Sequence, residues 1–361
     1  MSTLNVNNID KESGSTLTIG GSGTTVNVSN MVPDVALSNR NFIINGAMQV
    51  AQRATQVTGV TSSDYTTCDR WDIGLGNLGT WTVDQSTDAP NGFSNSFKVT
   101  CTTADASPAA SDLYLLRQRI EAQNLQHLAF GTADAKSMTL SFWVKSNKTG
   151  SASWGIRQAD NSNKMISKSY TINSADTWEY KTILIPADTA GVINNDNGYG
   201  FQIEWWLNSG TDWSSGSLQS TWSTDDNTNR NPSNLGVGGA VNDYFAITGV
   251  QLEVGEVATP FEHESYGQTL AKCQRYYEKS DSHCYIGMSW GLANTAGVVR
   301  TYVSFNTSKR ATPTMTYSNV STNWLAYNIA VGIHGFSVEC NAQVATTNAR
   351  PSFSFVADSE L

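Results

Sequence analysis

The residues best suited to binding chemistry lie at positions 201–208, where apolar and polar side chains alternate. Alternation with a period of two predicts a strand with two faces, and it places Gln202, Glu204 and Trp206 together on one of them. Sugars present apolar C–H faces and hydroxyl edges, so an exposed aromatic ring beside hydrogen-bonding side chains is a surface that binds them. The alternative is that Trp206 packs beneath a neighbouring loop or subunit.

Three other aromatic residues are candidates for the same kind of site. Trp213 lies in the segment 212–234, which is rich in Ser, Asn, Asp and Thr, and long segments of this kind form functional or mobile loops. Trp324 and Tyr327 lie on opposite faces of a predicted strand at 324–333, so at most one of them is buried. Other tryptophans are expected to pack internally, namely Trp71, Trp143, Trp205 and Trp222.

Catalytic chemistry is not indicated by the sequence. The chain lacks the motifs G-x-S-x-G, H-E-x-x-H and G-x-x-x-x-G-K-[ST], and its four histidines match no metal-ligand spacing. Glycoside cleavage requires two carboxylates roughly 5–10 Å apart, and Glu121, Glu204 and Asp243 are acidic residues that folding could bring together. We predict no catalytic residue, no metal ligand and no enzyme activity.

Two runs of oxygen-bearing side chains have the composition of calcium ligands. They are Asp-Asp-Asn at 225–227 and Asn-Asn-Asp-Asn at 194–197. Neither has the spacing of an EF-hand loop, and such runs are usually solvated turns. We therefore predict no cofactor, and a bound calcium ion is the alternative.

Charge and hydropathy exclude several classes of partner. The formal charge is −9, and Lys and Arg do not cluster, whereas nucleic acid requires a basic stripe and anionic lipid also attracts cations. No apolar run reaches the roughly 18 residues that a membrane-spanning helix needs. The N-terminus lacks the pattern of a signal peptide, so we expect synthesis in a cytosol. The five scattered cysteines are accordingly expected to be buried thiols.

The composition indicates an all-β protein. Hydrophobic residues make up 39% of the chain and charged residues only 15%, and aromatic residues separated by Ser, Thr, Asn and Gly are typical of short strands and polar turns. Strand patterns occur at 70–75, 79–85, 96–102, 113–121, 138–146, 153–158, 167–172, 179–185, 199–208 and 244–253. Their spacing favours a jelly-roll β-sandwich over residues 37–264. Gly249 falls where the alternation changes phase, which predicts a β-bulge.

A distinct segment, 1–36, precedes this domain. It carries two-residue apolar stubs between Gly- and Ser-rich turns, and such stubs form no core within one chain. Three copies wound around an axis would bury each other's strand edges, so we predict a trimeric β-repeat stalk. The alternative is a flexible tail with a weak β-strand pattern.

Two further units follow the jelly roll. Apolar residues at steps of about four predict a short linking helix over 265–280. Residues 281–361 then show strand patterns at 285–290, 298–305, 315–317, 324–333, 336–340 and 353–356. We predict a small C-terminal β-sandwich for 281–361, which at this size is more stable as part of an oligomer.

Several motifs of the chain resemble those of tail-fibre and receptor-binding proteins of tailed bacteriophages. The most distinctive part is the run GVQLEVG–ATPFE–CQRYYEK within residues 249–279. Four other matches precede it in the same order, at 41–49 (NFIINGAMQ), 68–71 (CDRW), 118–121 (QRIE) and 140–145 (LSFWVK). The resemblance covers residues 41–280, and the N-terminal run TLTIGGSGTTVNV and the C-terminal ADSEL also resemble parts of such fibres.

The resemblance implies a structural virion protein that attaches the particle to a host surface, usually as a homotrimer. The N-terminal segment would then bind tail or adaptor proteins, and residues 281–361 would be distal and a candidate for binding a host glycan or outer-membrane receptor. The expected location is the virion tail fibre, after synthesis in the host cytoplasm. The alternatives are a head or neck decoration fibre and a tailspike-like glycosidase.

The N-terminal pattern generates a direct prediction of assembly. Strand edges without partners in their own chain require other copies, so the full-length protein should be a homotrimer. Light scattering on the purified protein should give about three times the chain mass of 39.0 kDa. A monomer at micromolar concentration would contradict this prediction.

Overall fold

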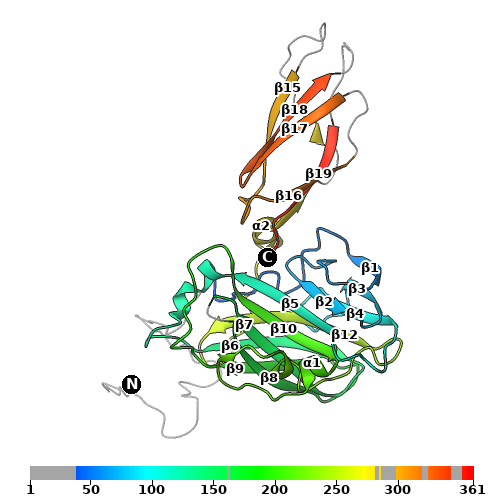
Figure 1. Cartoon of the computed structure of the whole chain (residues 1–361), viewed down its shortest axis with the longest axis vertical. Helices are drawn as coiled ribbons and strands as arrows, with labels where there is room; N and C mark the ends of the chain where they lie inside the picture. Colours follow the sequence, from blue (N-terminus) through cyan, green and yellow to red (C-terminus); the bar gives the residue numbers. More distant parts are fainter. Residues whose placement is uncertain (1–37, 161–162, 281–283, 286–297, 319–323, 343–351) are drawn as a thin grey trace, which may run out of the picture. The chain divides into compact units, whose positions relative to one another are not determined.

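The computed structural model describes residues 38–160, 163–280, 284–285, 298–318, 324–342 and 352–361 (Figure 1). Within these residues the protein is mostly β-sheet with a few short helices, as the composition predicts. The proposed stalk at 1–36 lies outside the described residues. No described helix is long and apolar enough to cross a membrane.

The first of two large sheets contains six antiparallel strands in the order β1-β3-β4-β12-β6-β9. The sequence patterns indicated all of them except β1, a short and largely exposed strand. Their bounds are β1 Gln56–Val60, β3 Thr80–Ser86, β4 Ser96–Thr103, β12 Tyr244–Val254, β6 Met138–Ser146 and β9 Glu179–Ile185.

The second large sheet also has six antiparallel strands, in the order β11-β8-β7-β10-β5-β2. Figure 1 shows β7, β10 and β5 side by side in it. The bounds are β11 Ser223–Thr224, β8 Lys164–Ile172, β7 Gly150–Gln158, β10 Tyr199–Ser209, β5 Leu113–Glu121 and β2 Asp72–Gly76. Short segments join the strands, namely the 3₁₀ helices η1 Ala122–Leu128 and η2 Asn227–Asn229 and the helix α1 Thr211–Ser214.

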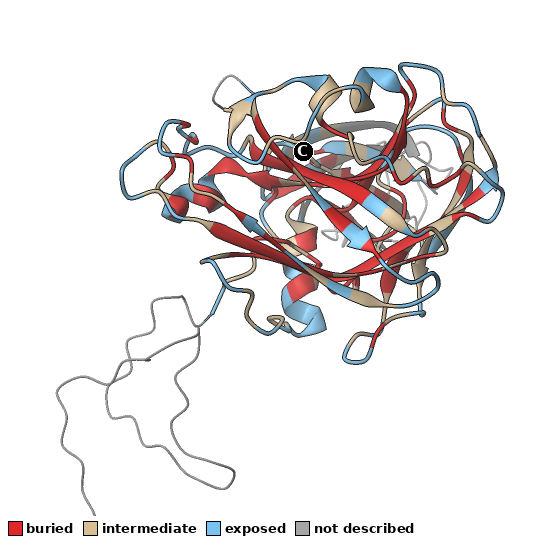
Figure 2. Ribbon diagram, turned by 90° about the horizontal axis from the view of Figure 1, so that it is seen from below, coloured by how far each residue is buried: buried red, intermediate tan, exposed pale blue. Residues whose placement is uncertain are grey.

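The inward faces of these two sheets form one aromatic core. Trp71, Phe142 and Trp205 are fully buried. The Trp205 ring contacts Trp71 at 5.4 Å, tilted, and Phe142 at 5.8 Å, edge-on, between centroids. Figure 2 shows the buried residues running along the strands, whereas exposed residues gather in the loops. Two packed antiparallel sheets confirm the β-sandwich that the strand spacing predicted.

The β-bulge predicted at Gly249 is present. The pairing of β12 with β6 shifts between Thr248 and Gln251, and Gly249 has a φ of +60°. A Cβ atom at this position would lie 2.6 Å from the Phe93 ring. Glycine is therefore required here for both its backbone conformation and its lack of a side chain.

The chain leaves the sandwich through α2 Tyr266–Gln274, which begins at Ser265 with a capping box to Gln268. The helix is shorter than the predicted 265–280. Its last part is instead the strand β13 Tyr277–Lys279, which pairs with β19 Ser352–Asp358. The helical pattern was wrong there because Tyr276 and Tyr277 are buried by packing that local periodicity does not report.

The C-terminal unit consists of two small antiparallel sheets. One joins β19 to β13, β14 Cys284–Tyr285 and β16 Thr314–Ser318, and the other has the order β15-β18-β17. The second sheet contains β15 Val298–Ser304, β18 Gly335–Ala342 and β17 Trp324–Gly332. Phe305, Phe336 and Phe355, from the end of β15, β18 and β19 respectively, form the described core of this C-terminal unit. The predicted strands at 298–305, 315–317, 324–333, 336–340 and 353–356 correspond to these elements, and most of 285–290 lies outside the described residues.

Two predictions inside the jelly roll need correction. The strand predicted to begin at Arg70 begins at Asp72, because Arg70 has a left-handed backbone with a φ of +71°. Trp143 was expected in the core, but it is only half-buried on the outer face of β6. Trp205 and Trp71 are core residues as predicted.

Candidate functional site

The three residues predicted to form a glycan surface do share one face of β10. Trp206 Nε1 donates to Glu204 Oε2 at 2.9 Å, and Gln202 Nε2 donates to Glu204 Oε1. All three side chains are nevertheless buried, and Trp206 is only 1% exposed. The prediction of an exposed aromatic plate at Trp206 is therefore wrong for this chain, and the packing alternative is correct.

The segment 211–234 is what covers this face. The Trp213 ring lies 5.5 Å from the Trp206 ring, and the Arg230 guanidinium lies over the Trp213 ring at 5.4 Å. Asn231 N donates to Trp213 O, and Ser233 N donates to Ser153 Oγ on β7. Hydrogen bonds therefore hold this polar loop against the sheet, and the half-buried Trp213 side chain covers Trp206.

The other predicted pair, Trp324 and Tyr327, belongs to β17. Their side chains lie outside the described residues, so their role as glycan-binding candidates stays a prediction. Trp222, predicted to pack, stacks on Phe201 at 5.8 Å and donates its indole N–H to Pro186 O.

The three carboxylates considered for catalysis have separate structural partners. Glu204 accepts from Gln202 and Trp206. Asp243 accepts from the backbone N–H groups of Gly238 and Ala240. Glu121 binds Arg275 and Tyr276. Each carboxylate therefore accepts hydrogen bonds that stabilise its own part of the fold.

The acidic run at 225–227 is occupied by similar structural contacts. The Asp225 carboxylate pairs with Arg157 at 2.7 Å and with Arg230 at 2.6 Å, and Asp226 caps η2 by accepting from Thr228 N. In the described residues no cluster of His, Cys, Asp and Glu has the arrangement of a metal site.

The motifs of the phage-fibre resemblance do come together, in two clusters of hydrogen bonds. The first joins the QLE and ATPFE parts. Gln251 Oε1 accepts from Glu262 N, and Glu253 Oε1 accepts from Thr259 N, both at 2.8 Å. The Glu262 carboxylate in turn accepts from the backbone N–H groups of Arg40 and Asn41 at 2.7 and 3.0 Å. These motif residues therefore fasten the chain entering the sandwich to the chain leaving it.

The second cluster is centred on the buried guanidinium of Arg70, from the CDRW motif. Its Nη2 donates to Arg119 O at 2.6 Å, its Nη1 pairs with Glu360, and its plane lies 3.5 Å from the Tyr276 ring. Burial by itself would lower the pKa of Arg70, but the Glu360 carboxylate, together with smaller contributions from Tyr276, Tyr65 and Cys273, offsets this and raises it. The buried side chain therefore stays charged.

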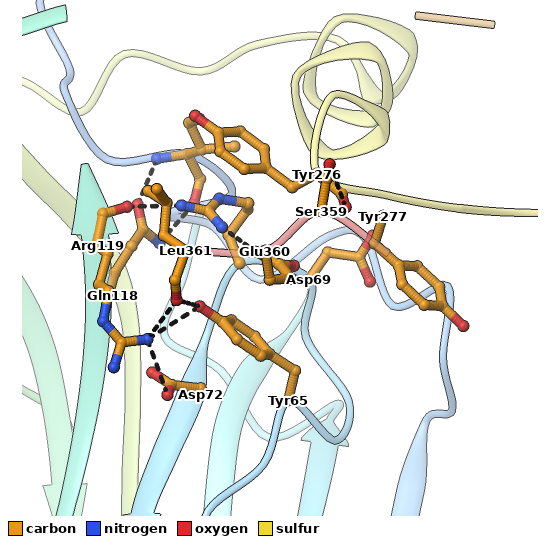
Figure 3. Close-up of polar contacts among 12 residues, drawn as sticks. Tyr65, Asp69, Asp72, Gln118, Arg119, Tyr276, Tyr277, Ser359, Glu360 and Leu361 are labelled. Atoms are coloured by element: carbon orange, nitrogen blue, oxygen red, sulfur yellow. Dashed lines mark hydrogen bonds and ion pairs between the residues drawn. The ribbon is translucent and has the colours of Figure 1, made fainter. Parts of the chain in front are cut away.

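The same cluster binds the last residues of the sequence. Arg119 Nη1 donates to Leu361 O at 2.7 Å, and Ser359 N donates to Tyr276 O. Figure 3 shows Ser359–Leu361 lying among Tyr65, Arg119 and Tyr276. We call this group of contacts the ionic junction; it also includes Glu121, Arg275 and Arg53, whose guanidinium pairs with Glu360 at 3.3 Å.

Glu121 of the QRIE motif is the second buried charge of the ionic junction. Arg275 holds it through two bonds of 2.7 and 2.8 Å, and the Tyr276 hydroxyl donates to the same carboxylate. Burial by itself would raise the pKa of Glu121, but the bonds from Arg275, Tyr276 and Gln123 hold it below its ordinary value. The CQRYYEK motif is thus a set of partners for buried groups of the jelly roll.

Sequence reasoning missed an accessible aromatic surface on the first sheet. Trp143 and Tyr180 lie side by side on β6 and β9 with ring centroids 5.3 Å apart, and Phe93, Trp178, Phe261 and His263 are near them. We call these six residues the aromatic strip. The signal available was the outward phase of Trp143 and Tyr180 in the strand patterns at 138–146 and 179–185. It was outweighed by treating a motif tryptophan as core.

Comparisons with known proteins find proteins similar to this chain only among solved structures. No protein-family model matches the chain, and no curated protein matches it. The chain is similar to the enzymatically active domain of tailspike protein 4 from bacteriophage CBA120, with 14% identity, a TM-score of 0.31 and coverage of 60% of this chain. The chain spans about a fifth of that protein, 21% of its length.

Two other similar structures are carbohydrate-binding modules. The module TmCBM61, solved with β-1,4-galactotriose, shares 10% identity at a TM-score of 0.30, covering 60% of this chain and 99% of the module. The family 11 module of the cellulase Lic26A-Cel5E of Clostridium thermocellum shares 12% identity at 0.29, covering 58% and 99%. At these scores the similarities do not assign a function to this chain.

The burial of Arg70 generates a stability prediction. Substitution Glu360→Ala leaves a buried cation without its carboxylate, which should reduce the free energy of unfolding by about 3–5 kcal/mol. Urea denaturation of the full-length protein measures this. The exposed Glu256 is the matched control, and Glu256→Ala should change stability by less than about 0.5 kcal/mol. Equal stability of the two variants would contradict the role of Glu360.

The lowered pKa of Glu121 generates a prediction of pH dependence. A carboxyl group whose folded pKa is depressed stabilises the protein above its unfolded pKa, and this contribution is lost as the pH falls through the folded value. The stability difference between wild type and Glu121→Gln should therefore be largest at neutral pH and shrink below about pH 4.3. Thermal unfolding across this range tests it, with Glu256→Gln as the control. A difference that grows on acidification would have the wrong sign for this assignment.

Proposed function

We propose that this chain is a non-catalytic receptor-binding protein of a tailed-bacteriophage virion, which attaches the particle to a glycan on the host cell surface. In this proposal the protein is a homotrimer on the tail fibre, held to tail or adaptor proteins through residues 1–36. It is made in the host cytoplasm and binds neither nucleic acid nor membrane.

The observation that carries the proposal is the convergence of the phage-fibre motifs. The residues quoted for the resemblance lie far apart in sequence, yet Arg70, Arg119 and Tyr276 meet in the ionic junction. A chance match of short motifs has no reason to assemble in space. The resemblance is therefore supported by several motifs at once, and this supports the attachment role that it implies.

The chemistry of the same residues supports a binding role over catalysis. A catalytic acid or base needs access to substrate, whereas Glu121, Glu204 and Glu360 are buried or nearly so and are bonded to neighbouring side chains. A virion protein that recognises sugars through shape and hydrogen bonds needs no such group. Three copies on one particle would add avidity to weak individual sites.

The proposal predicts glycan-dependent binding to cells. Fluorescently labelled full-length protein should bind a subset of bacterial strains, and mild periodate oxidation of the cells should abolish binding because it opens sugar rings. Mock-oxidised cells are the control. Binding that survives periodate but is lost after protease treatment would contradict a glycan receptor.

Two further measurements separate the alternatives. Release of reducing sugars from the bound cells would indicate a tailspike-like glycosidase, and we expect none. Immunogold labelling of virions should mark the tail tip, whereas labelling of the head or neck would indicate a decoration fibre.

A further inference from the structure

The aromatic strip is a continuous row of rings on the outer face of the first sheet. At one end Tyr180 is 45% exposed and packs beside half-buried Trp143. In the middle, the space above Gly249 is shared by Trp143 and Phe93, because a Cβ there would meet the two rings at 3.0 and 2.6 Å. Phe93 then contacts Phe261 at 5.0 Å and exposed His263 at 5.3 Å.

Hydrogen-bonding groups lie along one edge of the strip. Trp178 Nε1 donates to Asp88 Oδ1 at 3.0 Å, and Lys145 Nζ pairs with Asp88 Oδ2 at 2.9 Å. Nearby, Lys98 lies over the Tyr244 ring at 4.6 Å, and the Tyr244 hydroxyl donates to Asp176. Two lysines and two aspartates therefore stand beside the rings, and their charges balance.

Two polar groups on the rings themselves have no partner within the described residues. Neither the Trp143 indole N–H nor the Tyr180 hydroxyl is hydrogen-bonded to another described residue. A polar group at the edge of an exposed ring is available to a ligand that has hydroxyl groups. The rings, meanwhile, offer apolar surface to the C–H face of the same ligand.

We propose that the aromatic strip binds an uncharged glycan chain, with Tyr180 and Trp143 as the stacking surface and the edge around Asp88 and Lys145 as the hydrogen-bonding side. This inference rests on the proposed function and assigns it a site. Neighbouring rings with adjacent donors and acceptors match a sugar, which is apolar on its faces and polar at its rim. Balanced charges on the edge favour a neutral sugar over an acidic one.

The aromatic strip is also accessible to a ligand, which the predicted face of β10 is not. Trp206 is closed beneath Trp213 and the loop 211–234, whereas Tyr180 is open and Trp143 and Trp178 are partly open. Trp143 and Tyr180 extend from neighbouring strands in direct register. Rigid strands hold a recognition surface better than a loop does.

The test uses full-length protein on a printed array of purified bacterial surface polysaccharides, both uncharged and acidic. Tyr180→Ser is the main variant, because this ring is 45% exposed and Trp143 is its ring partner among the described residues. Trp178→Phe keeps a ring but removes the indole N–H bond to Asp88. The matched control is Tyr302→Ser, since Tyr302 is 58% exposed on β15, away from the strip.

Wild type should bind uncharged polysaccharides. Tyr180→Ser should weaken that binding at least about tenfold, as expected for an aromatic residue at the centre of a site. Trp178→Phe should weaken it less, and Tyr302→Ser should match wild type.

Several results would overturn the inference. Glycan binding by Tyr180→Ser within twofold of wild type would rule out the strip as the binding site while leaving the proposed function intact. Binding to acidic polysaccharides alone would have the same consequence. A changed oligomeric mass of Tyr180→Ser in light scattering would show that the strip is a contact between copies. A wild-type protein that binds no polysaccharide, but binds cells through a protease-sensitive receptor, would overturn both the strip and the proposed glycan receptor.

Discussion

A buried positive charge is the constraint on which the arrangement of this chain depends. Arg70 is fully buried, and a guanidinium cannot lose its proton to escape the cost of leaving water. It must therefore meet a carboxylate and hydrogen-bond acceptors, and the fold supplies them from distant parts of the sequence: Glu360, Arg119 O and the face of Tyr276. This requirement brings the end of the described chain and the residues after α2 back onto the jelly roll.

The ionic junction and the hydrogen-bond cluster around Glu262 organise different parts of the chain. Gln251 and Glu253 hold the segment 259–262 against β12, and Glu262 binds the chain at residue 40. Glu121 and Arg70 then fix the segment that follows α2. The buried motif residues are thus mainly scaffolding, whereas the proposed recognition surface uses outward-facing side chains such as Tyr180 and Trp143.

Much of the sandwich was predictable, because strand alternation reports directly which side chains face a common core. Residues 113–121, 138–146 and 179–185 were predicted at the bounds observed, and the bulge at Gly249 followed from a change of phase. The candidate site was not predictable in the same way. Alternation places Trp206 on a face but does not say what covers that face, and the covering loop 211–234 has no periodicity of its own. Trp143 shows the converse error, since its outward phase was the correct signal. The left-handed backbone of Arg70 and the strand at 277–279 depend on tertiary partners that no local pattern contains.

A double-mutant cycle on Arg70 and Glu360 tests the central claim most directly. Arg70→Met, Glu360→Met and the double variant would be compared with wild type by urea denaturation of the full-length protein. If the charges of Arg70 and Glu360 stabilise each other, the double variant should be more stable than Glu360→Met alone, with a coupling energy of about 2–3 kcal/mol. Additive effects within about 0.5 kcal/mol would contradict the account, because Arg70 would then be stabilised by something other than Glu360.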